Sequence, residues 1–288
     1  MNKWTCLMLA ASGLGFVCLA HGDSDRWTVR EEENTQKTMT LSGEPMRLVI
    51  DNLDGYVHVT GTTGSQVRVT AHKTIRAETQ SDLNQAKSEV KLDMTEQPGS
   101  VSIEYAAPWR CRGNCGGCCD SHRRFYEVTY DIDVEAPRTA RMVISGVNGS
   151  LRLDQIDGDF DVHAVNGGVK MSGISGFGDV HTVNGAVTVQ FAKNPAQACS
   201  FKTVNGAVDA EFQPGLSADL SFKTFNGQIY SDFDVTALPM PTAETERKNG
   251  MFVYRSNHRL HEARAGRGGP KLSFETLNGG IRLHEQQR

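Results

Sequence analysis

The chain has little of what marks a nucleic-acid-binding, membrane-spanning or helical protein. Its 288 residues carry 30 Lys and Arg against 34 Asp and Glu, a net charge of −4 at pH 7, so the concentrated basic face of a nucleic-acid-binding surface is missing. After residue 20 no apolar run is long enough to cross a bilayer. Proline is scarce, at nine residues, whereas glycine is frequent, at 29. This balance suits a β protein rich in turns.

Recognisable catalytic and cofactor motifs are also missing. The segment 264–269 lacks the Gly-Lys-Ser/Thr ending of a phosphate loop, and no nucleophile elbow is present. The acidic run 154–161 does not have the spacing of a calcium-binding loop and is interpreted as solvated turn carboxylates. We therefore expect a non-enzymatic protein without a cofactor. A polysaccharide-cleaving enzyme acting through Asp159 is the remaining enzymatic alternative.

The N-terminus has the pattern of an export signal. Lys3 provides a positive start, and an apolar stretch ends in small residues at Ala20. Residues 1–20 are therefore predicted to be a signal peptide, with an uncleaved anchor as the alternative. Export predicts a periplasmic, extracellular or cell-surface location, with membrane contact only if this segment is retained. Residues 21–37 are interpreted as a linker.

An Asn-Gly step is repeated through the second half of the chain. The intervals between successive pairs are 18, 18, 21, 21 and 52 residues, and a short strand-like run follows each pair. A fixed short period indicates stacked copies of one structural unit. Glycine after each asparagine is expected to supply the positive φ of a tight turn. The predicted turn residues are Asn148, Gly149, Asn166, Gly167, Asn184, Gly185, Asn205, Gly206, Asn226, Gly227, Asn278 and Gly279.

Blocks of about nine residues predict an all-β fold in which two strands form each turn of a β-solenoid or a related two-sheet stack. Aligned copies place apolar residues in two columns that should be buried. The first column comprises Ile144, Val162, Val180, Phe201, Phe222 and Phe274, and the second comprises Leu151, Val169, Val187, Val208, Ile229 and Ile281. We expect the repeat region to span 141–288, with an insertion at 234–273.

Residues 38–140 are predicted to form an N-terminal β region with strand-like alternation. A helical pattern interrupts it at 81–92, where Ser81 is a candidate N-cap, and a Cys-rich loop spans 109–124. This region is either a separate domain or the first turns of the same stack. Because NLDGYVHV is similar to the later copies, we favour the second interpretation.

Several segments resemble a known bacterial family, the putative adhesins with β-strand repeats (domain-of-unknown-function family 4097). The resemblance rests on MRLVIDNLDGYVHVTG, VTYDIDVEAP, the two Thr-Val-Asn-Gly copies and GRGGPKLSFETLNGGIRL. It covers roughly residues 45–285. The resemblance implies an envelope or surface location and an adhesive or interaction role, and it supplies no catalytic residues. The Cys-rich loop departs from the family pattern.

The Cys-rich loop is a candidate chemical site with three interpretations. Cys111, Cys115, Cys118 and Cys119 form an even local set, which in an exported protein favours two disulfides. Together with His122, they are also potential zinc ligands. The third interpretation is a redox-active thiol. Cys199, the remaining cysteine after residue 20, is expected to be a free, buried thiol.

One outward column of the repeats is the candidate binding face. His163 and His181 occupy equivalent positions, and Lys202, Lys223 and Glu275 continue the column. We interpret the column as a solvated ladder, with metal binding by the two imidazoles as an alternative. The leading hypothesis is an adhesin-like interaction protein that binds an unidentified glycan, peptide or envelope component. The alternative is a metal- or redox-responsive envelope protein that acts through Cys111–Cys119.

Overall fold

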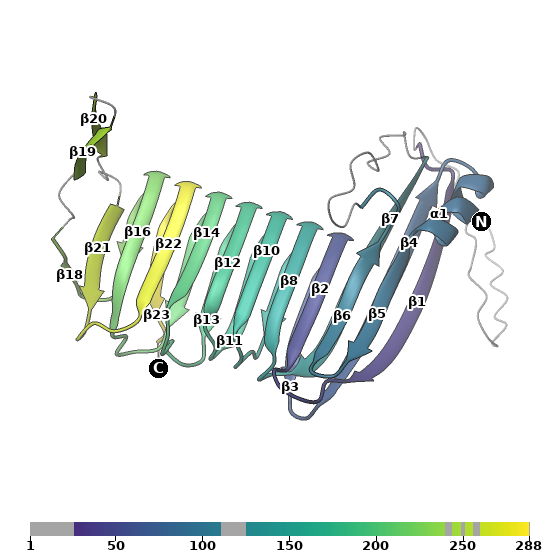
Figure 1. Cartoon of the computed structure of the whole chain (residues 1–288), viewed down its shortest axis with the longest axis horizontal. Coiled ribbons are helices and arrows are strands. Elements are labelled where there is room, and N and C mark those ends of the chain that lie inside the picture. Colours follow the sequence, from purple (N-terminus) through teal and green to yellow (C-terminus); the bar gives the residue numbers. More distant parts are fainter. Residues whose placement is uncertain (1–25, 111–124, 240–243, 249–250, 256–259, 288) are drawn as a thin grey trace, which may run out of the picture.

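The computed structural model describes residues 26–110, 125–239, 244–248, 251–255 and 260–287. Within these residues the chain is nearly all β, as Figure 1 shows, with two large mixed sheets, a two-stranded sheet and one helix. The predicted all-β class is therefore confirmed.

Sheet A contains ten strands and sheet B eleven among the described residues. In spatial order, sheet A comprises β1 (Val29–Thr40), β4 (Gln66–Ala77), β7 (Tyr126–Pro137), β3 (Val57–Thr62), β9 (Leu151–Asp154), β11 (Val169–Ile174), β13 (Val187–Phe191), β15 (Val208–Phe212), β23 (Ile281–Glu285) and β17 (Ile229–Ser231). Sheet B comprises β18 (Val235–Ala237), β21 (Leu260–Ala265), β16 (Ala218–Asn226), β22 (Lys271–Asn278), β14 (Cys199–Asn205), β12 (Gly178–Asn184), β10 (Phe160–Asn166), β8 (Arg141–Asn148), β2 (Arg47–Asp54), β6 (Ser100–Ala106) and β5 (Lys91–Gln97). The separate hairpin comprises β19 (Glu244–Lys248) and β20 (Met251–Arg255).

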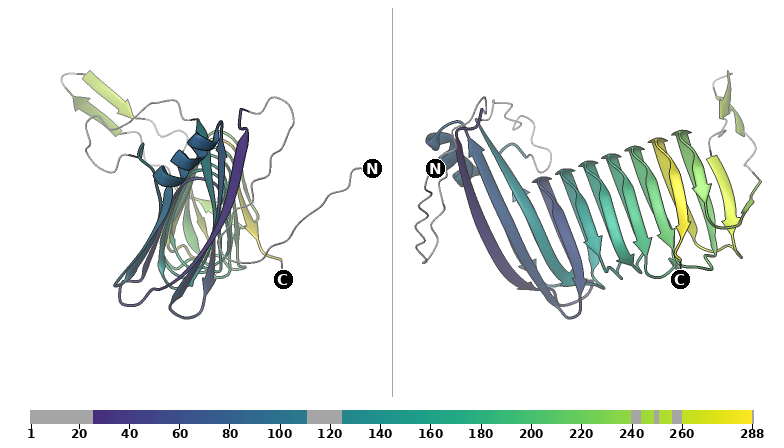
Figure 2. Two further views of the ribbon diagram at one scale, coloured as in Figure 1. Left: turned by 90° about the vertical axis from the view of Figure 1, so that its right-hand side faces the viewer. Right: turned by 180° about the vertical axis from the view of Figure 1, so that it is seen from behind.

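The two large sheets pack face to face, and the core lies between them (Figure 2). Alternation along each strand produces this arrangement, because successive side chains point to opposite faces. In β10, for example, Phe160, Val162 and Ala164 are buried whereas His163 is exposed. Both predicted apolar columns lie in register between neighbouring strands: Val162 is level with Ile144 and Val180, and Val169 with Leu151 and Val187.

The spatial order of the copies differs from their order along the chain. The final copy, β22 and β23, lies between the two copies that precede it. β22 pairs in parallel with β14 on one side and β16 on the other, and β23 pairs with β15 and β17. Aromatic stacking accompanies this insertion, because the Phe274 ring lies 5.6 Å from both Phe201 and Phe222.

The N-terminal half joins the repeats without a break in either sheet. β2 pairs in parallel with β8, and β3 with β9. Asp54 thereby lies level with Asn148. The helix α1 (Gln80–Glu89) packs on β1, β4 and β7 at this end, burying Leu83 and Ala86. Its N-cap is Thr79, whose hydroxyl accepts a hydrogen bond from the Asp82 amide, so the expectation of Ser81 as the cap was wrong.

The reason expected for the corner glycines was also wrong. Among the six Asn-Gly glycines only Gly149 has φ in the left-handed region, at 146°. The other five glycines are required because their backbone lies in close contact with the backbone of the neighbouring copy. A Cβ at Gly185 would lie 2.3 Å from the Gly167 carbonyl oxygen, and one at Gly206 would lie 2.1 Å from that of Gly185. The stacking of successive Asn-Gly steps thus excludes any side chain at this glycine position.

The segment expected as an insertion, 234–273, adds strands at the C-terminal end of the stack. β21 pairs antiparallel with β16, and β18 pairs with β21. The hairpin β19–β20 lies between them in the chain. In the part of the chain that the structure describes, no helix is long and apolar enough to cross a membrane.

Candidate functional site

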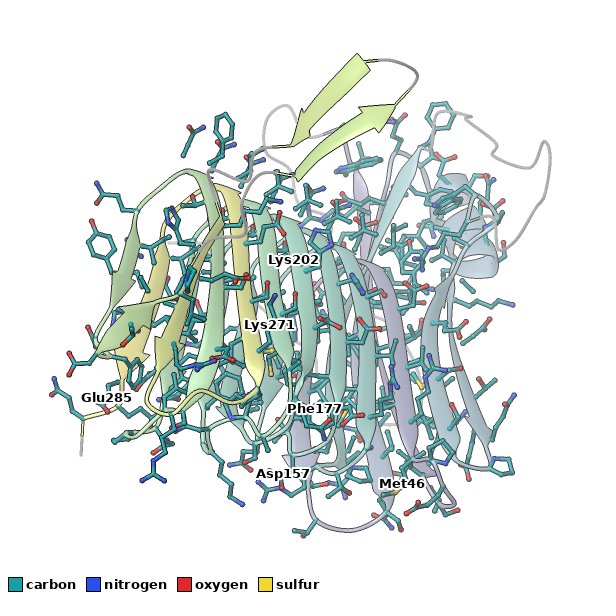
Figure 3. All side chains as sticks on the ribbon, turned by 60° about the vertical axis from the view of Figure 1, so that its left-hand side comes forward. Met46, Asp157, Phe177, Lys202, Lys271 and Glu285 are labelled. Atoms are coloured by element: carbon teal, nitrogen blue, oxygen red, sulfur yellow. The ribbon has the colours of Figure 1, made fainter. Side chains whose placement is uncertain are left out.

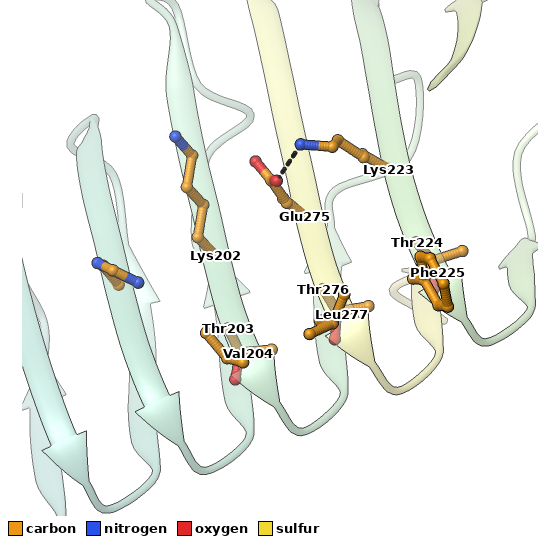
Figure 4. A pocket seen from close by; sticks show the side chains of 10 residues that line it. Lys202, Thr203, Val204, Lys223, Thr224, Phe225, Glu275, Thr276 and Leu277 are labelled. Atoms are coloured by element: carbon orange, nitrogen blue, oxygen red, sulfur yellow. Dashed lines mark hydrogen bonds and ion pairs between the residues drawn. The ribbon is translucent and has the colours of Figure 1, made fainter. Parts of the chain in front are cut away.

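The outer face of sheet B brings the predicted binding-face residues into one column. Cross-strand pairing places His163 beside His181, His181 beside Lys202, and Lys202 beside Glu275. Because β22 lies between β14 and β16, Glu275 separates Lys202 from Lys223. Lys202 is labelled on this face in Figure 3 and, with its neighbours, in Figure 4. The order of charges along the column therefore follows the tertiary structure and differs from the order in the chain.

The two histidines lie close together but do not form a recognisable metal site. Their ring centroids are 6.0 Å apart, and His163 Nε2 lies 2.8 Å from Asp161 Oδ1. Across the described ranges, no group of three or more His, Cys, Asp and Glu side chains has the arrangement of metal ligands. The metal-binding alternative for this pair thus gains no support from the described residues.

The two lysines differ in their electrostatic partners. Lys223 Nζ donates to Glu275 Oε1 at 2.5 Å, and this pair is largely solvent-exposed. Lys202 makes no hydrogen bond or ion pair with any residue that the structure describes. Since the Lys223 charge is matched by Glu275, Lys202 carries the net positive charge of this part of the face and can pair with a ligand anion.

A row of apolar side chains runs beside the charged column. Each residue that precedes a repeated asparagine, or Asp54 at the equivalent position, lies two positions after the column residue and points to the same outward face. We call this row the apolar ladder; in spatial order it comprises Leu53, Val147, Val165, Val183, Val204, Leu277 and Phe225. Val165, Leu277 and Phe225 are 40%, 45% and 50% exposed. The Val-Asn-Gly pattern contained this signal, but the sequence interpretation treated these residues only as part of the turns.

A cavity of about 280 Å³ lies where the charged column and the apolar ladder meet at the C-terminal end (Figure 4). Its lining combines the last three apolar-ladder residues with cationic side chains. The residues are His181, Lys202, Thr203, Val204, Lys223, Thr224, Phe225, Glu275, Thr276 and Leu277. Apolar surface beside an unmatched positive charge fits an amphipathic or anionic ligand group.

The predicted turn asparagines form a hydrogen-bonded row, the Asn ladder, along the end of the same face. Its seven rungs, in spatial order, are Asp54, Asn148, Asn166, Asn184, Asn205, Asn278 and Asn226. Every Nδ2 donates to the side-chain oxygen of the preceding rung, at 2.7–2.9 Å. The amide dipoles therefore point the same way, and the row ends on the Asp54 carboxylate, a charge-assisted acceptor.

The cysteine predictions divide into one described residue and four that are not described. Cys111, Cys115, Cys118, Cys119 and His122 lie outside the described residues, as does the predicted signal peptide 1–20. Cys199 is free and buried, which confirms the expectation for this thiol. Burial raises the pKa of Cys199 to about 11, so it remains a neutral thiol at physiological pH.

Comparison with known proteins finds partly similar solved structures and assigns no family. No family model matches the chain, and no curated protein matches it. A putative cell adhesion protein from Clostridium sporogenes is similar over 88% of this chain and 100% of its own, with 9% identity and a TM-score of 0.41. A putative adhesin from Bacteroides fragilis is similar over 88% and 97%, with 9% identity and a TM-score of 0.38. At these scores the comparisons assign no ligand to this chain.

Proposed function

We propose that this chain is an exported, non-enzymatic interaction protein of the bacterial envelope. In this proposal the repeat region is a β-solenoid with Asn-Gly corners, and the outer face of sheet B binds an envelope or surface ligand. The sequence resemblance to adhesins with β-strand repeats supports the same class of function. The ligand contacts are assigned to the column of His163, His181, Lys202 and Lys223 and to the apolar ladder beside it.

The juxtaposition of Lys202 with the exposed apolar ladder is the observation that carries the proposal. Contiguous apolar side chains on a surface mark interaction sites more often than scattered ones do. Here the exposed Leu277 and Phe225 border a cavity that is also lined by Lys202, whose charge is unmatched among the described residues. A rigid sheet holds these groups in place, so little conformational entropy is lost when a ligand binds.

Charge reversal at Lys202 tests the proposal. We expect Lys202→Glu to weaken attachment of the labelled protein to an envelope fraction about tenfold, a loss of roughly 1.4 kcal/mol, because a like charge would then face the anionic ligand group. The matched control is Lys170→Glu, which places the same charge change on an exposed position of sheet A. Attachment would be measured by co-sedimentation over a range of protein concentrations.

The comparison of Lys202→Glu with Lys170→Glu shows whether the sheet B face binds the envelope fraction. Equal attachment of wild type, Lys202→Glu and Lys170→Glu would show that the sheet B face does not bind the fraction. Equal weakening in both variants would indicate non-specific electrostatic adsorption. Circular dichroism of each variant would establish that the fold is retained.

A further inference from the structure

A second cavity lies at the opposite end of the same ladders. It has a volume of about 550 Å³ and is lined by Leu53, Asp54 and Asn148, the first rungs of the apolar and Asn ladders. Its other walls include Trp27, Trp109 and Tyr126, and we call it the aromatic cavity. The two cavities are therefore connected by an unbroken row of carboxamide and apolar side chains.

The longer N-terminal strands form the wall of the aromatic cavity. β7 pairs with β3 only from Ile132 onward, and Tyr130 lies against Gly55, so Tyr126 to Thr129 extend beyond this end of β2 and β3. Figure 1 shows β7, β4 and α1 rising above the level at which the neighbouring strands end. A ligand that lies along the ladders would meet this wall at the end marked by Leu53 and Asp54.

The lining of the aromatic cavity has the chemistry of a sugar-binding site. The Trp27 ring is partly exposed, with the Arg26 guanidinium 4.6 Å from its centre. The Tyr126 ring is buried and lies 6.0 Å from that of Trp109, which packs against the core, so these two rings form the floor of the cavity. An accessible aromatic face such as that of Trp27 packs against the C–H face of a pyranose, while carboxylates such as Asp54 and Glu127 accept hydrogen bonds from its hydroxyls.

The ladder between the cavities continues this chemistry. Each asparagine between the two ends of the row uses one N–H and one oxygen lone pair within it, which leaves a second N–H and a second lone pair for a ligand. Six intervals at about 4.8 Å give a row of roughly 29 Å from the first rung to the last. Alternating polar and apolar contacts over this length suit a linear polymer that carries both hydroxyls and C–H surface.

An extended peptide fits the ladder less well. Peptides that bind by strand addition need unpaired backbone groups at a sheet edge. Along the described rungs, each interior strand is paired on both sides, and the corner amides are paired as well, for example Gly167 N to Asn184 O at 3.0 Å. Recognition here must therefore use side chains, which is how the hydroxyls and ring faces of a saccharide are bound.

We propose that the Asn and apolar ladders bind a linear polysaccharide across the strands, with one sugar seated in the aromatic cavity beside Trp27. The inference rests on the proposed function, since it names the ligand class of the same face and extends that face to a second cavity. Lys202, at the far end, is placed to pair with a carboxylate on an acidic polysaccharide.

The test uses the full chain and three portions of one envelope fraction. The first portion is untreated, the second is protease-digested and delipidated, and the third is oxidised exhaustively with periodate, which cleaves sugar rings at vicinal hydroxyls. We expect binding to the second portion to equal binding to the first, and binding to the third to be lost. Trp27→Ala should weaken binding to the second portion about tenfold, with partial recovery in Trp27→Phe.

The outcomes separate this inference from the proposed function. Lys202-dependent binding that survives periodate but not protease would identify a protein ligand; it would overturn the polysaccharide inference and leave the interaction function intact. Unchanged binding by Trp27→Ala would exclude the aromatic cavity. Absence of wild-type binding to all three portions would overturn both. Because Trp27 is only partly buried, its substitution should leave the fold intact. A variant in the middle of the apolar ladder, Val183→Asp, tests the ladder independently, and we expect the same loss of binding.

Discussion

The glycine that follows each repeated asparagine shows how the absence of a Cβ atom can decide the residue at a position. Its backbone lies so close to the preceding corner that a Cβ would overlap a carbonyl oxygen. Interiors packed at this density respond to an added methyl group by shifting the backbone or breaking hydrogen bonds. The repeated glycine is thus a condition for stacking, and it acts between positions that are far apart in the chain, for example Gly206 and Gly279.

Alanine substitution at two glycines in neighbouring copies, Gly185 and Gly168, tests this explanation. We expect Gly185→Ala to lower the free energy of unfolding by about 1–3 kcal/mol, because its Cβ would lie 2.3 Å from the Gly167 oxygen. Gly168→Ala is the matched control; its Cβ would meet the Ala186 oxygen at 3.2 Å, and the equivalent positions already carry Ala186 and Ala207. Denaturant unfolding measures both, and equal effects would contradict the stacking explanation.

At the scale of elements, the final copy supports its two neighbours. β22 carries Phe274 between Phe201 and Phe222, and all three rings are buried. The last copy along the chain is therefore an inner strand pair of the stack and packs against a copy on each side. The strands β14 and β16, which are neighbouring sheet B copies in the chain, do not pair with each other and depend on β22.

Truncating phenylalanines in these strands tests the spatial order, in which β22 lies between β14 and β16. We expect Phe274→Ala to cost about 3–5 kcal/mol of unfolding free energy, because it removes a ring that is stacked on both sides. Phe222→Ala should cost less, since Phe222 stacks on Phe274 alone among the described rings and lies nearer the end of the sheet. Chemical denaturation of both variants provides the measurement. A larger loss for Phe222→Ala would argue that β16, rather than β22, occupies the inner position.

At the scale of the whole molecule, the ends of both sheets carry features that discourage association. The outermost strand β1 is rich in charged residues, and the outermost strands β17 and β18 are three residues long. Charged and short edge strands are common protections against edge-to-edge pairing. At the C-terminal end β21 covers β16, and Val235 and Leu238 line an apolar cavity together with Phe222.

Removing this cover should cause self-association. We expect replacement of residues 235–265 by a Gly/Ser linker to produce dimers or larger species, because the unpaired edge of β16 and its apolar side chains would be exposed. Light scattering coupled to size-exclusion chromatography would detect them. Adding Ser221→Lys to the shortened chain should reduce the association by placing a charge on that strand. A shortened chain that stays monomeric at all concentrations would contradict this role for β18 and β21.

Local pattern was sufficient to predict much of the fold. Period-two alternation identified the strands, and equivalent positions such as Val162 and Val180 defined the register, because a one-residue slip would move every buried side chain to the outer face. The helix near 80–90 was also visible as a change in period. The binding-face column followed from the same register, although its ligand contacts remain a proposal.

The amino-acid sequence by itself determined the all-β class, the rung register and the outward column, because these depend on short-range alternation within each copy. It could not determine the order of the copies: each presents similar phenylalanine and asparagine residues to its neighbour, so β22 pairs equally well in register with either β14 or β16. Long-range packing decided that β22 enters between them and that Glu275 separates Lys202 from Lys223. Tertiary structure also assembled the aromatic cavity, because Trp27, Trp109 and Tyr126 come from separate segments that meet only where β7 extends beyond the stack.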